Sequence, residues 1–254
     1  MHELFTGMAQ LVDKPFQKKC WSLIERFFLP RFQNGYTVSE QIAEYYRQKY
    51  NVCLNVIPNY PITRSVATLS PKPSKKYLLY QGTIIPGRYF EEMMLAAKET
   101  GYDLVICGEG VLFPKLKDFI EWNRFTHVHL KGWVQPSELI KYTEQAWAGL
   151  NLLSDSLNEQ LTCVNRYFDF IQAGLPQISV GHAVYRDANE RFKVSLLIEK
   201  VTVRELVNTI RKLENEELYH ELQRNTVSAA AFYTWERHEP VLKEVYEKVR
   251  KTVN

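Results

Sequence analysis

The side chains best suited to chemistry in this sequence lie in the stretch 165–180. Arg166 and Asp169 share one predicted helix there, and Gly174 and Pro176 end it, because glycine adopts a left-handed φ and proline cannot continue a helix. Apolar runs before and after this helix are predicted to be buried strands. One guanidinium and one carboxylate are therefore held on a helix between two strands, where a phosphate-bearing ligand such as a sugar nucleotide can bind.

A glycine-flanked loop follows the predicted strand 77–81. Gly82, Thr83 and Arg88 lie in this loop, just before a helix that is expected from Phe90. Backbone N–H groups and the positive end of a helix dipole face the mouth of such a loop, so it suits an anion. Arg88 is equally compatible with a solvated arginine at a helix start, and the sequence leaves this alternative open.

Two further loops follow predicted strands. Gly108 and Gly110 form a Gly-x-Gly sequence, which is typical of a tight turn that needs glycine whether or not a ligand is near. Trp133 and Val134 follow the next strand, where the indole could stack on a base or serve as an ordinary core or surface tryptophan. These loops by themselves do not identify a ligand.

The composition is that of a globular protein with a small positive charge. Its 254 residues are 45% apolar and 24% charged, which allows a full core in one large domain or two smaller ones. A net charge of +3 does not indicate nucleic-acid binding, although a phosphate-bearing ligand is compatible with it. Four cysteines without a Cys-x-x-Cys pair indicate reduced thiols, no metal site and a cytoplasmic setting. The sequence contains neither the ~20-residue apolar run that spans a membrane nor a secretory signal.

Strand-like and helical runs alternate from residue 77 onward. This alternation predicts an α/β fold with a doubly wound, Rossmann-like parallel sheet of six strands and helices on both faces. The predicted strands are 77–81, 103–107, 127–130, 148–153, 177–180 and 195–198. We expect a nucleotide-binding domain over 77–234.

The first sixty residues are predicted to be mostly helical. A helix through 21–28 breaks at Pro30, a second helix begins after Ser39 as its N-cap, and a short strand covers 52–57. Two helices and one strand cannot close a core alone. We therefore interpret 1–60 as the remnant of another domain.

Two segments connect these parts. Residues 61–76 are rich in proline, serine and threonine and are predicted to form a linker. Residues 235–254 have the apolar spacing of a final amphipathic helix, which we expect to cross back to the N-terminal part.

The predicted helix 165–173 resembles a segment of a known family. Phe168-Asp169-Phe170 followed by Gly174-Leu175-Pro176 is similar to the Phe-Glu-Tyr or Phe-Asp-Tyr triplet and Gly-Leu-Pro turn of the large retaining family of GT-B glycosyltransferases. The resemblance covers 76–254. It implies two Rossmann-like halves facing a cleft, with the nucleotide-sugar donor bound by the C-terminal half.

A weaker resemblance covers residues 1–60. Thr37-Val38-Ser39 and Ile57-Pro58-Asn59 are similar to segments near the end of that family's N-terminal half. His2 matches a family histidine close to the transferred sugar and is carried over as the catalytic candidate. The chain would then lack the opening βα units that shape the acceptor site, so the resemblance implies a truncated enzyme.

The resemblance places the donor diphosphate at the loop after the first strand of the sheet. Thr83, next to Gly82, occupies the position of the family's first basic residue, and Arg88 fits the second. In the pair Asn165-Arg166, the planar guanidinium is expected to direct positive charge toward the phosphates. One of the family's cationic contacts is therefore missing.

The resemblance also assigns the rest of the nucleotide. The Asp169 carboxylate is implied to accept both ribose hydroxyls, whereas an acid that only complements its helix dipole remains the alternative. Gly108 would lie under the donor, and the backbone around Trp133 and Val134 would bond the nucleobase. Leu161 stands where many members carry a second acid, with Glu159 the nearest carboxylate. A proline usual in the family is replaced as well, by Val164.

The function implied by the resemblance is transfer of a hexose from a UDP- or GDP-sugar to a glycan or lipid-linked acceptor. The donor is the substrate and no cofactor is implied. Helix termini, Arg88 and Arg166 would stabilise the departing diphosphate, so the reaction would need no metal. The alternative from another class is a non-catalytic nucleotide-sugar-binding subunit that needs a second chain to complete the cleft. A nucleotide-sugar epimerase is a third hypothesis.

A membrane contact is a further hypothesis. Basic residues accompany aromatic ones in the first predicted helix, an arrangement that can lie on anionic lipid at the inner face of a membrane. The basic residues are Lys14, Lys18, Lys19 and Arg26, and the aromatic ones are Phe16, Trp21, Phe27 and Phe28. The same residues would be buried if another part of the domain covered them.

Overall fold

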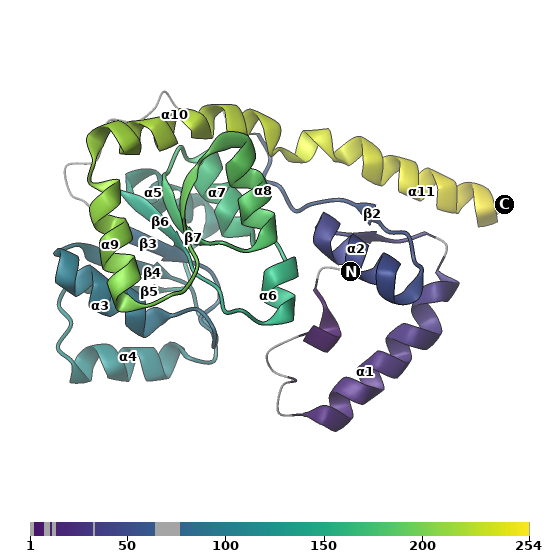
Figure 1. The fold of residues 1–254 in the computed structure, drawn as a ribbon, viewed down its shortest axis with the longest axis horizontal. Helices are drawn as coiled ribbons and strands as arrows, with labels where there is room; N and C mark the ends of the chain where they lie inside the picture. Colours follow the sequence, from purple (N-terminus) through teal and green to yellow (C-terminus); the bar gives the residue numbers. More distant parts are fainter. Residues whose placement is uncertain (1–2, 8–10, 12–13, 33, 64–76, 254) are drawn as a thin grey trace.

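The computed structural model describes residues 3–7, 11, 14–32, 34–63 and 77–253. Figure 1 shows two parts: a sheet wrapped by helices, and the N-terminal segment beside it. Helices α10 (Glu216–Phe232) and α11 (Glu239–Val253) run in succession from the first part toward the second.

Six parallel strands form the main sheet, in the order β5-β4-β3-β6-β7-β8. Their bounds are β3 Tyr77–Gln81, β4 Asp103–Cys107, β5 Val128–Gly132, β6 Ala148–Asn151, β7 Gln177–Val180 and β8 Ser195–Ile198. The predicted doubly wound sheet is confirmed. Its order reverses between β3 and β6, and in open α/β sheets ligands bind at such a switch point, outside the carboxyl ends of the strands.

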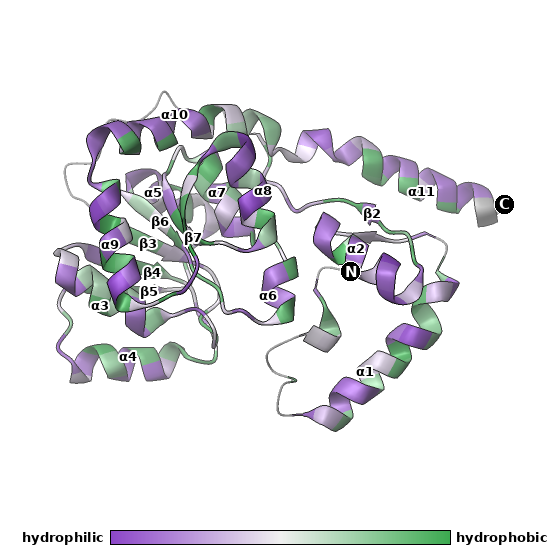
Figure 2. Ribbon diagram, viewed as in Figure 1, coloured by the Kyte–Doolittle hydropathy of each residue, from purple (hydrophilic) through white to green (hydrophobic). Residues whose placement is uncertain are grey.

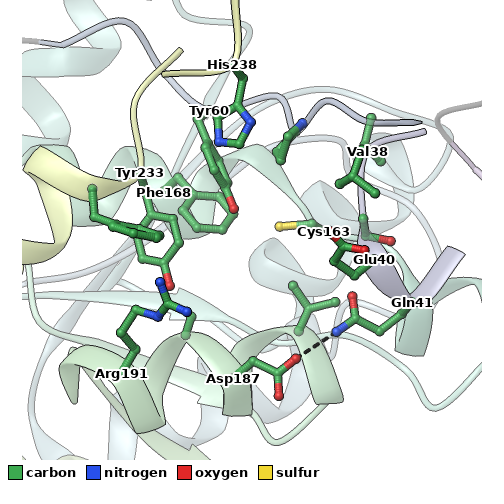
Figure 3. Close-up of a pocket in the computed structure, with 16 residues that line it drawn as sticks. Val38, Glu40, Gln41, Tyr60, Cys163, Phe168, Asp187, Arg191, Tyr233 and His238 are labelled. Carbon is green, nitrogen blue, oxygen red and sulfur yellow. Dashed lines mark hydrogen bonds between the residues drawn. The ribbon is translucent and has the colours of Figure 1, made fainter. Parts of the chain in front are cut away.

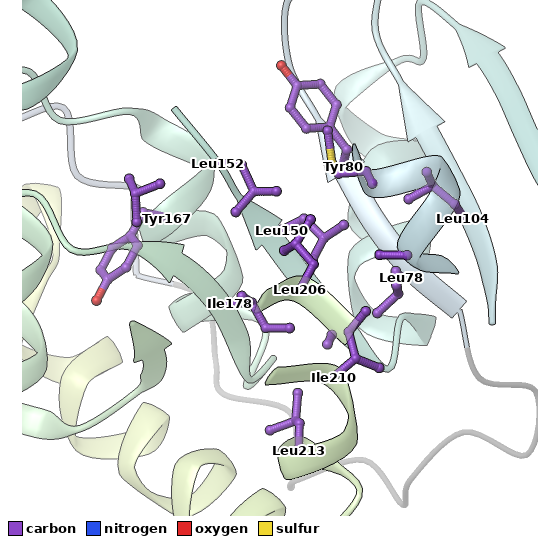
Figure 4. Packing of buried hydrophobic residues seen from close by; sticks show 14 of the residues in the cluster. Leu78, Tyr80, Leu104, Leu150, Leu152, Tyr167, Ile178, Leu206, Ile210 and Leu213 are labelled. Carbon is purple, nitrogen blue, oxygen red and sulfur yellow. The ribbon is translucent and has the colours of Figure 1, made fainter. Parts of the chain in front are cut away.

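The central strand β3 is apolar at successive positions because helices cover both faces of the sheet. Leu78 and Tyr80 belong to one core cluster, whereas Leu79 belongs to a second. Successive side chains of a strand point to opposite faces, so a strand that is buried on both sides is apolar throughout. Figure 4 shows the first of these clusters, where Ile210 of α9 (Val203–Leu213) packs toward Leu78.

The helices between the strands divide over the two faces. The inter-strand helices are α3 Phe90–Thr100, α4 Phe113–Trp122, α5 Pro136–Gln145, α6 Leu157–Leu161, α7 Asn165–Gln172 and α8 Ala183–Phe192. Helices α3 and α4 contribute side chains to the cluster of Leu78, together with α9 and α10. Helix α5 packs on the other face, around Leu79, where Phe170 of α7 joins it.

A glycine in β6 determines how closely α7 approaches the sheet. A Cβ added at Gly149 would lie 2.4 Å from the Phe170 ring, which is less than any van der Waals contact allows. Glycine therefore lets α7 pack directly on β6, and this fixes the side chains at the start of α7.

Two strand boundaries differ from the prediction. Strand β6 ends at Asn151, although Leu152 and Leu153 are fully buried, because burial of an apolar residue does not require pairing in the sheet. Strand β5 begins one residue late and continues to Gly132, which pairs with Cys107 after an irregularity in register.

The N-terminal segment is a small α/β unit with its own cluster of buried residues. Its elements are η1 Phe5–Gly7, α1 Pro15–Phe28, η3 Leu29–Arg31, β1 Tyr36–Thr37, α2 Glu40–Tyr50 and β2 Asn55–Val56. The predicted cap is confirmed, since Ser39 Oγ accepts from Ile42 N at 3.2 Å. The predicted strand 52–57 is shorter, as β2, and pairs in parallel with β1, which the sequence analysis did not identify.

Apolar side chains remain exposed along α1, and Figure 2 shows apolar and polar residues alternating on this helix. The final helix α11 approaches the same segment, because Val245 and Tyr246 line a cavity together with Leu29 and Leu54. Most of the predicted linker, 64–76, lies outside the described residues. The proposed domain boundaries stay predictions. Within the described part of the chain, every helix is too short or too polar to cross a bilayer.

Candidate functional site: a cavity with two arginines at the switch point of the sheet

A cavity of about 420 Å³ opens at the carboxyl edge of the sheet, between the loop after β3 and the start of α7. The N-terminal segment contributes Val38 and Asn59 to its wall. The residues predicted from the sequence that line it are Gly82, Thr83, Arg88, Asn165, Arg166 and Asp169. The structure therefore brings together six site residues from two separate stretches of the chain.

Arg88 is one of two buried cations in this cavity. Arg88 is 8% exposed, and its Nη1 atom lies 2.9 Å from Glu159 Oε2. Nη1 is not directed at this oxygen as a hydrogen bond requires, so the contact is an ion pair only. The neighbouring Nε is buried without a hydrogen-bond partner among the described residues. Arg88 is thus a buried arginine of the cavity, and the alternative of a solvated arginine is wrong.

Arg166 is the second cation, and its contacts are with neutral groups. It is 7% exposed, Nε donates to Asn151 Oδ1 at 3.1 Å, and Nη2 donates to the Leu152 carbonyl at 3.5 Å. The guanidinium carbon lies 4.8 Å from the centre of the Tyr80 ring. Burial lowers the pKa of Arg166, and the charge of Arg88 lowers this pKa further. Two cations share a desolvated space, so an anion between them would relieve both desolvation and repulsion.

Asp169 lies on the same side of α7 as Arg166, as the spacing of three residues on a helix requires. The carboxylate is partly exposed, and its Oδ2 accepts a hydrogen bond from Gln81 Nε2 at 3.2 Å. Gln81 is itself fixed, because its Oε1 accepts from Thr143 Oγ1 at 2.9 Å. The carboxylate is therefore oriented by β3 at the wall of the cavity.

Two residues that hold this site, Asn151 and Gln81, were not predicted from the sequence. Asn151 is fully buried at the end of β6, where it accepts from Arg166 and donates to Ser179 Oγ at 2.9 Å. Gln81 ends β3 and orients Asp169. Both are amides in otherwise apolar strands, directly before a loop. A polar residue at the end of a buried apolar strand is the sequence signal that could have identified Asn151 and Gln81.

Three predicted residues lie on neighbouring loops and do not line the cavity of 420 Å³. A Cβ at Gly108 would lie 1.9 Å from the Gly82 carbonyl oxygen, so glycine is required there by the close approach of two loops. Trp133 is 61% exposed, and Val134 packs beside the core cluster of Leu79. Their nucleotide contacts stay predictions. The catalytic candidate His2 lies outside the described residues.

A second cavity, of about 290 Å³, adjoins the first, since Val38 and Cys163 line both. It lies between α2, α8 and the end of α10, and Figure 3 shows Tyr60, Tyr233 and Arg191 around it. Gln41 Nε2 donates to Asp187 Oδ2 at 2.8 Å and joins α2 to α8. None of the described residues that the sequence analysis assigned to the site faces this second space. No group of three or more metal-binding side chains occurs in the described part of the chain.

The fold is that of the GT-B glycosyltransferases. Sucrose-phosphate synthase from Thermosynechococcus elongatus superposes with a TM-score of 0.77 at 15% identity, over 99% of this chain and 67% of that one. Anabaena HepE, solved with UDP and glucose, gives a TM-score of 0.71 at 11% identity over 96% and 70% of the two chains. TarM of S. aureus gives 0.70 at 15% identity and covers 91% of this chain.

The chain spans 46% of the length of TarM. No protein-family model and no curated protein sequence matches it. Identities this low show the shared fold and nothing finer. The resemblance that the short motifs indicated is thus confirmed for the architecture.

Proposed function

We propose that the chain is the donor-binding part of a glycosyltransferase and that the cavity between β3 and α7 binds the diphosphate of a nucleotide-linked sugar. The observation that carries this proposal is the pair of buried guanidinium groups, Arg88 and Arg166, in one cavity with the Asp169 carboxylate. HepE and TarM, which share the fold, were solved with UDP. A nucleoside diphosphate supplies phosphate oxygens for the arginines and ribose hydroxyls for the carboxylate.

In the reaction that we propose, the two arginines act on the leaving group. Negative charge develops on the diphosphate as the bond to the sugar breaks, and oriented cations in a desolvated site stabilise that charge. The start of α7 adds backbone N–H groups at the same place, whereas Gly82 N already donates to the Cys107 carbonyl at 2.9 Å. The proposal includes a hexose as the transferred group, a glycan or lipid-linked acceptor, no cofactor, and no requirement for a metal.

Isothermal titration of the chain with UDP, GDP and their sugars tests the binding step. We expect heat with one of the two diphosphates in the presence of EDTA, and weaker binding for an Arg166→Gln variant. The matched control is Arg204→Gln, which removes an exposed arginine of α9 far from the cavity lining. Absence of heat with every nucleotide would defeat the proposal.

A non-catalytic nucleotide-sugar-binding subunit is the second candidate. The chain spans less than half of TarM, and GtfA, whose structure this chain also resembles, was solved in a GtfA/B complex. Incubation of the chain with its nucleotide-sugar donor, with free sugar measured by chromatography, distinguishes the enzyme from the binding subunit. An enzyme slowly hydrolyses the donor and releases free sugar, whereas a binding subunit leaves the donor intact.

The exposed apolar side chains of α1 support the part of the proposal that includes a second chain. Phe16 is 78% exposed, Leu23 58% and Phe27 55%. Large exposed apolar patches mark interaction surfaces. We propose that another polypeptide covers them, with anionic lipid at the inner face of a membrane as the competing occupant. Co-sedimentation with vesicles that contain phosphatidylserine would support lipid in place of protein.

A further inference from the structure

The Arg88 guanidinium is buried, and its charge needs a partner. The Glu159 side chain, 13% exposed, lies against the Arg88 side chain, 9% exposed. A single buried charge is costly, whereas an ion pair of this kind keeps the cation inside the protein at neutral pH. Glu159 is therefore the residue that allows an arginine to remain in the wall of the cavity.

The contact with Glu159 leaves donors of Arg88 available. A guanidinium carries five N–H donors in a fixed fork. The carboxylate approaches Nη1 at 2.9 Å without hydrogen-bond alignment, and Nε is buried without a partner among the described residues. Arg88 therefore lines the cavity with N–H donors, on Nε and Nη1, that have no hydrogen-bond acceptor among the described residues. An acceptor that enters the cavity can use these donors while Glu159 stays in place.

Helix α6, which carries Glu159, is held by the N-terminal segment. Leu4 N donates to Asn158 Oδ1 at 2.7 Å, and Ser39 Oγ donates to the Leu161 carbonyl at 2.7 Å. Both contacts join residues that are far apart in the sequence. A helix of only five residues is marginal alone, so these contacts determine where its side chains lie.

A second support comes from the start of α8. His182, which is 7% exposed, lies with its Nδ1 at 3.0 Å from the Glu159 carbonyl and its Nε2 at 3.3 Å from Asp155 Oδ1. The backbone of Glu159 is therefore fixed on the side that faces the main sheet. Helix α6 is clamped between the two parts of the molecule.

We infer that Glu159 is a positioning residue, which holds Arg88 with its free donors toward the diphosphate of the bound nucleotide. Glu159 itself does not touch the ligand. This inference rests on the proposed function, because it needs a diphosphate in the cavity. It also gives the N-terminal segment a part in donor binding, through its hold on α6.

Titration of UDP and uridine, or of GDP and guanosine if the chain binds GDP, tests this inference on Glu159→Gln, Arg88→Gln and the double variant. We expect Glu159→Gln to lower the affinity for the diphosphate about tenfold, the effect of one charge-assisted hydrogen bond. Affinity for the nucleoside should not change, because Arg88 reaches only the phosphates. In the Arg88→Gln background, Glu159→Gln should have no further effect on diphosphate binding.

The controls separate positioning from folding. Glu190→Gln makes the same chemical change at an exposed position of α8 and should bind as the unmodified chain does. Glu159→Asp keeps the charge and should recover part of the affinity. If Glu159→Gln fails to fold, diphosphate binding by Glu159→Asp is compared with that of the unmodified chain instead.

Several outcomes would overturn the inference. Unchanged or tighter diphosphate binding by Glu159→Gln would show that the carboxylate is idle or competes with the ligand. An equal loss for the diphosphate and the nucleoside would show a merely structural role. If the unmodified chain binds neither UDP nor GDP, the proposed function fails first, and the inference fails with it.

Discussion

At the level of single residues, the two arginines of the cavity differ in how they are held. Arg166 is fixed by the neutral oxygens of Asn151 and Leu152, and no ion pair joins it to an acid among the described residues. Arg88 has a carboxylate beside it, from Glu159. Arg166 is therefore held by neutral groups, whereas Arg88 supplies donors whose direction a second residue controls.

Asp169 should determine whether the site distinguishes ribose from deoxyribose. We expect the unmodified chain to bind UDP about tenfold more tightly than 2′-deoxy-UDP, because a carboxylate accepts strongly from the 2′-hydroxyl. Asp169→Asn should lose this preference, and titration of both nucleotides measures it. A preference that survives in Asp169→Asn would contradict the assignment. Asp118→Asn, at an exposed position of α4 outside the lining of this cavity, is the matched control.

The four cysteines should react in two classes. Cys20 and Cys53 are exposed, whereas burial raises the pKa of Cys107 to about 11 and also raises the pKa of Cys163. Only the thiolate reacts, so a raised pKa leaves less thiolate at pH 8 and lowers the rate of reaction. Ellman's reagent should titrate two thiols at once in the native chain and four after denaturation. Rapid reaction of four thiols in the native chain would contradict the packing around β4.

At the level of secondary-structure elements, the site depends on loops that approach each other closely. The loop after β3 contacts the loop after β4 so tightly that position 108 has no room for a side chain. Helix α7 packs against β6 at Gly149 in the same way. The positions of Gly82, Arg166 and Asp169 therefore follow from the close approach of backbone to backbone at Gly108 and of backbone to the Phe170 ring at Gly149.

Gly149→Ala should displace α7. The added methyl group would overlap the Phe170 ring, and overpacking of this kind costs about 1–3 kcal/mol of unfolding free energy. Urea denaturation measures the loss of stability, and nucleotide titration measures the effect on the site. Phe170→Leu in the same chain should restore part of the stability, because it removes the ring that the methyl group meets. A single variant as stable as the original would show that α7 can move without cost.

At the level of the whole molecule, the cavity lies between two parts that share side chains. Val38 and Asn59 of the N-terminal segment line it together with α7, and Asn158 bonds to Leu4 across the same boundary. Trp235 N donates to the Pro61 carbonyl at 2.9 Å, which ties the start of the final helical segment to the end of the N-terminal one. Ligand binding in the cavity should therefore stabilise both parts together.

We expect UDP or GDP, whichever binds, to raise the unfolding temperature in a single cooperative transition. At a hundredfold excess over its Kd, a ligand that binds only the folded state adds about 2.7 kcal/mol of stability. Differential scanning calorimetry with and without the nucleotide measures this shift, and adenosine at the same concentration is the control. Two separate transitions, of which only one moves, would show that the N-terminal segment folds independently of the site.

The sequence by itself determined the six-stranded parallel sheet and six cavity residues. Apolar runs such as 78–80 and 104–107 have no polar face, which is the pattern of strands buried on both sides, and this information is local. Gly82, Arg88 and Arg166 were identifiable because loops and helix starts after such strands meet at one edge of a parallel sheet. The short strand β1 was missed, since two residues carry no periodicity.

Only the tertiary structure decided which side chains meet. Gln81 orients Asp169 although the two are 88 residues apart, and Glu159 reaches Arg88 from a short helix whose own sequence does not fix its position. Such pairs depend on strand order and on the distance between packed elements, which hydrophobic periodicity does not encode. The same is true of Gly108, whose need for glycine comes from the carbonyl of another loop. Local pattern therefore specifies the elements, and close packing between distant segments specifies the site.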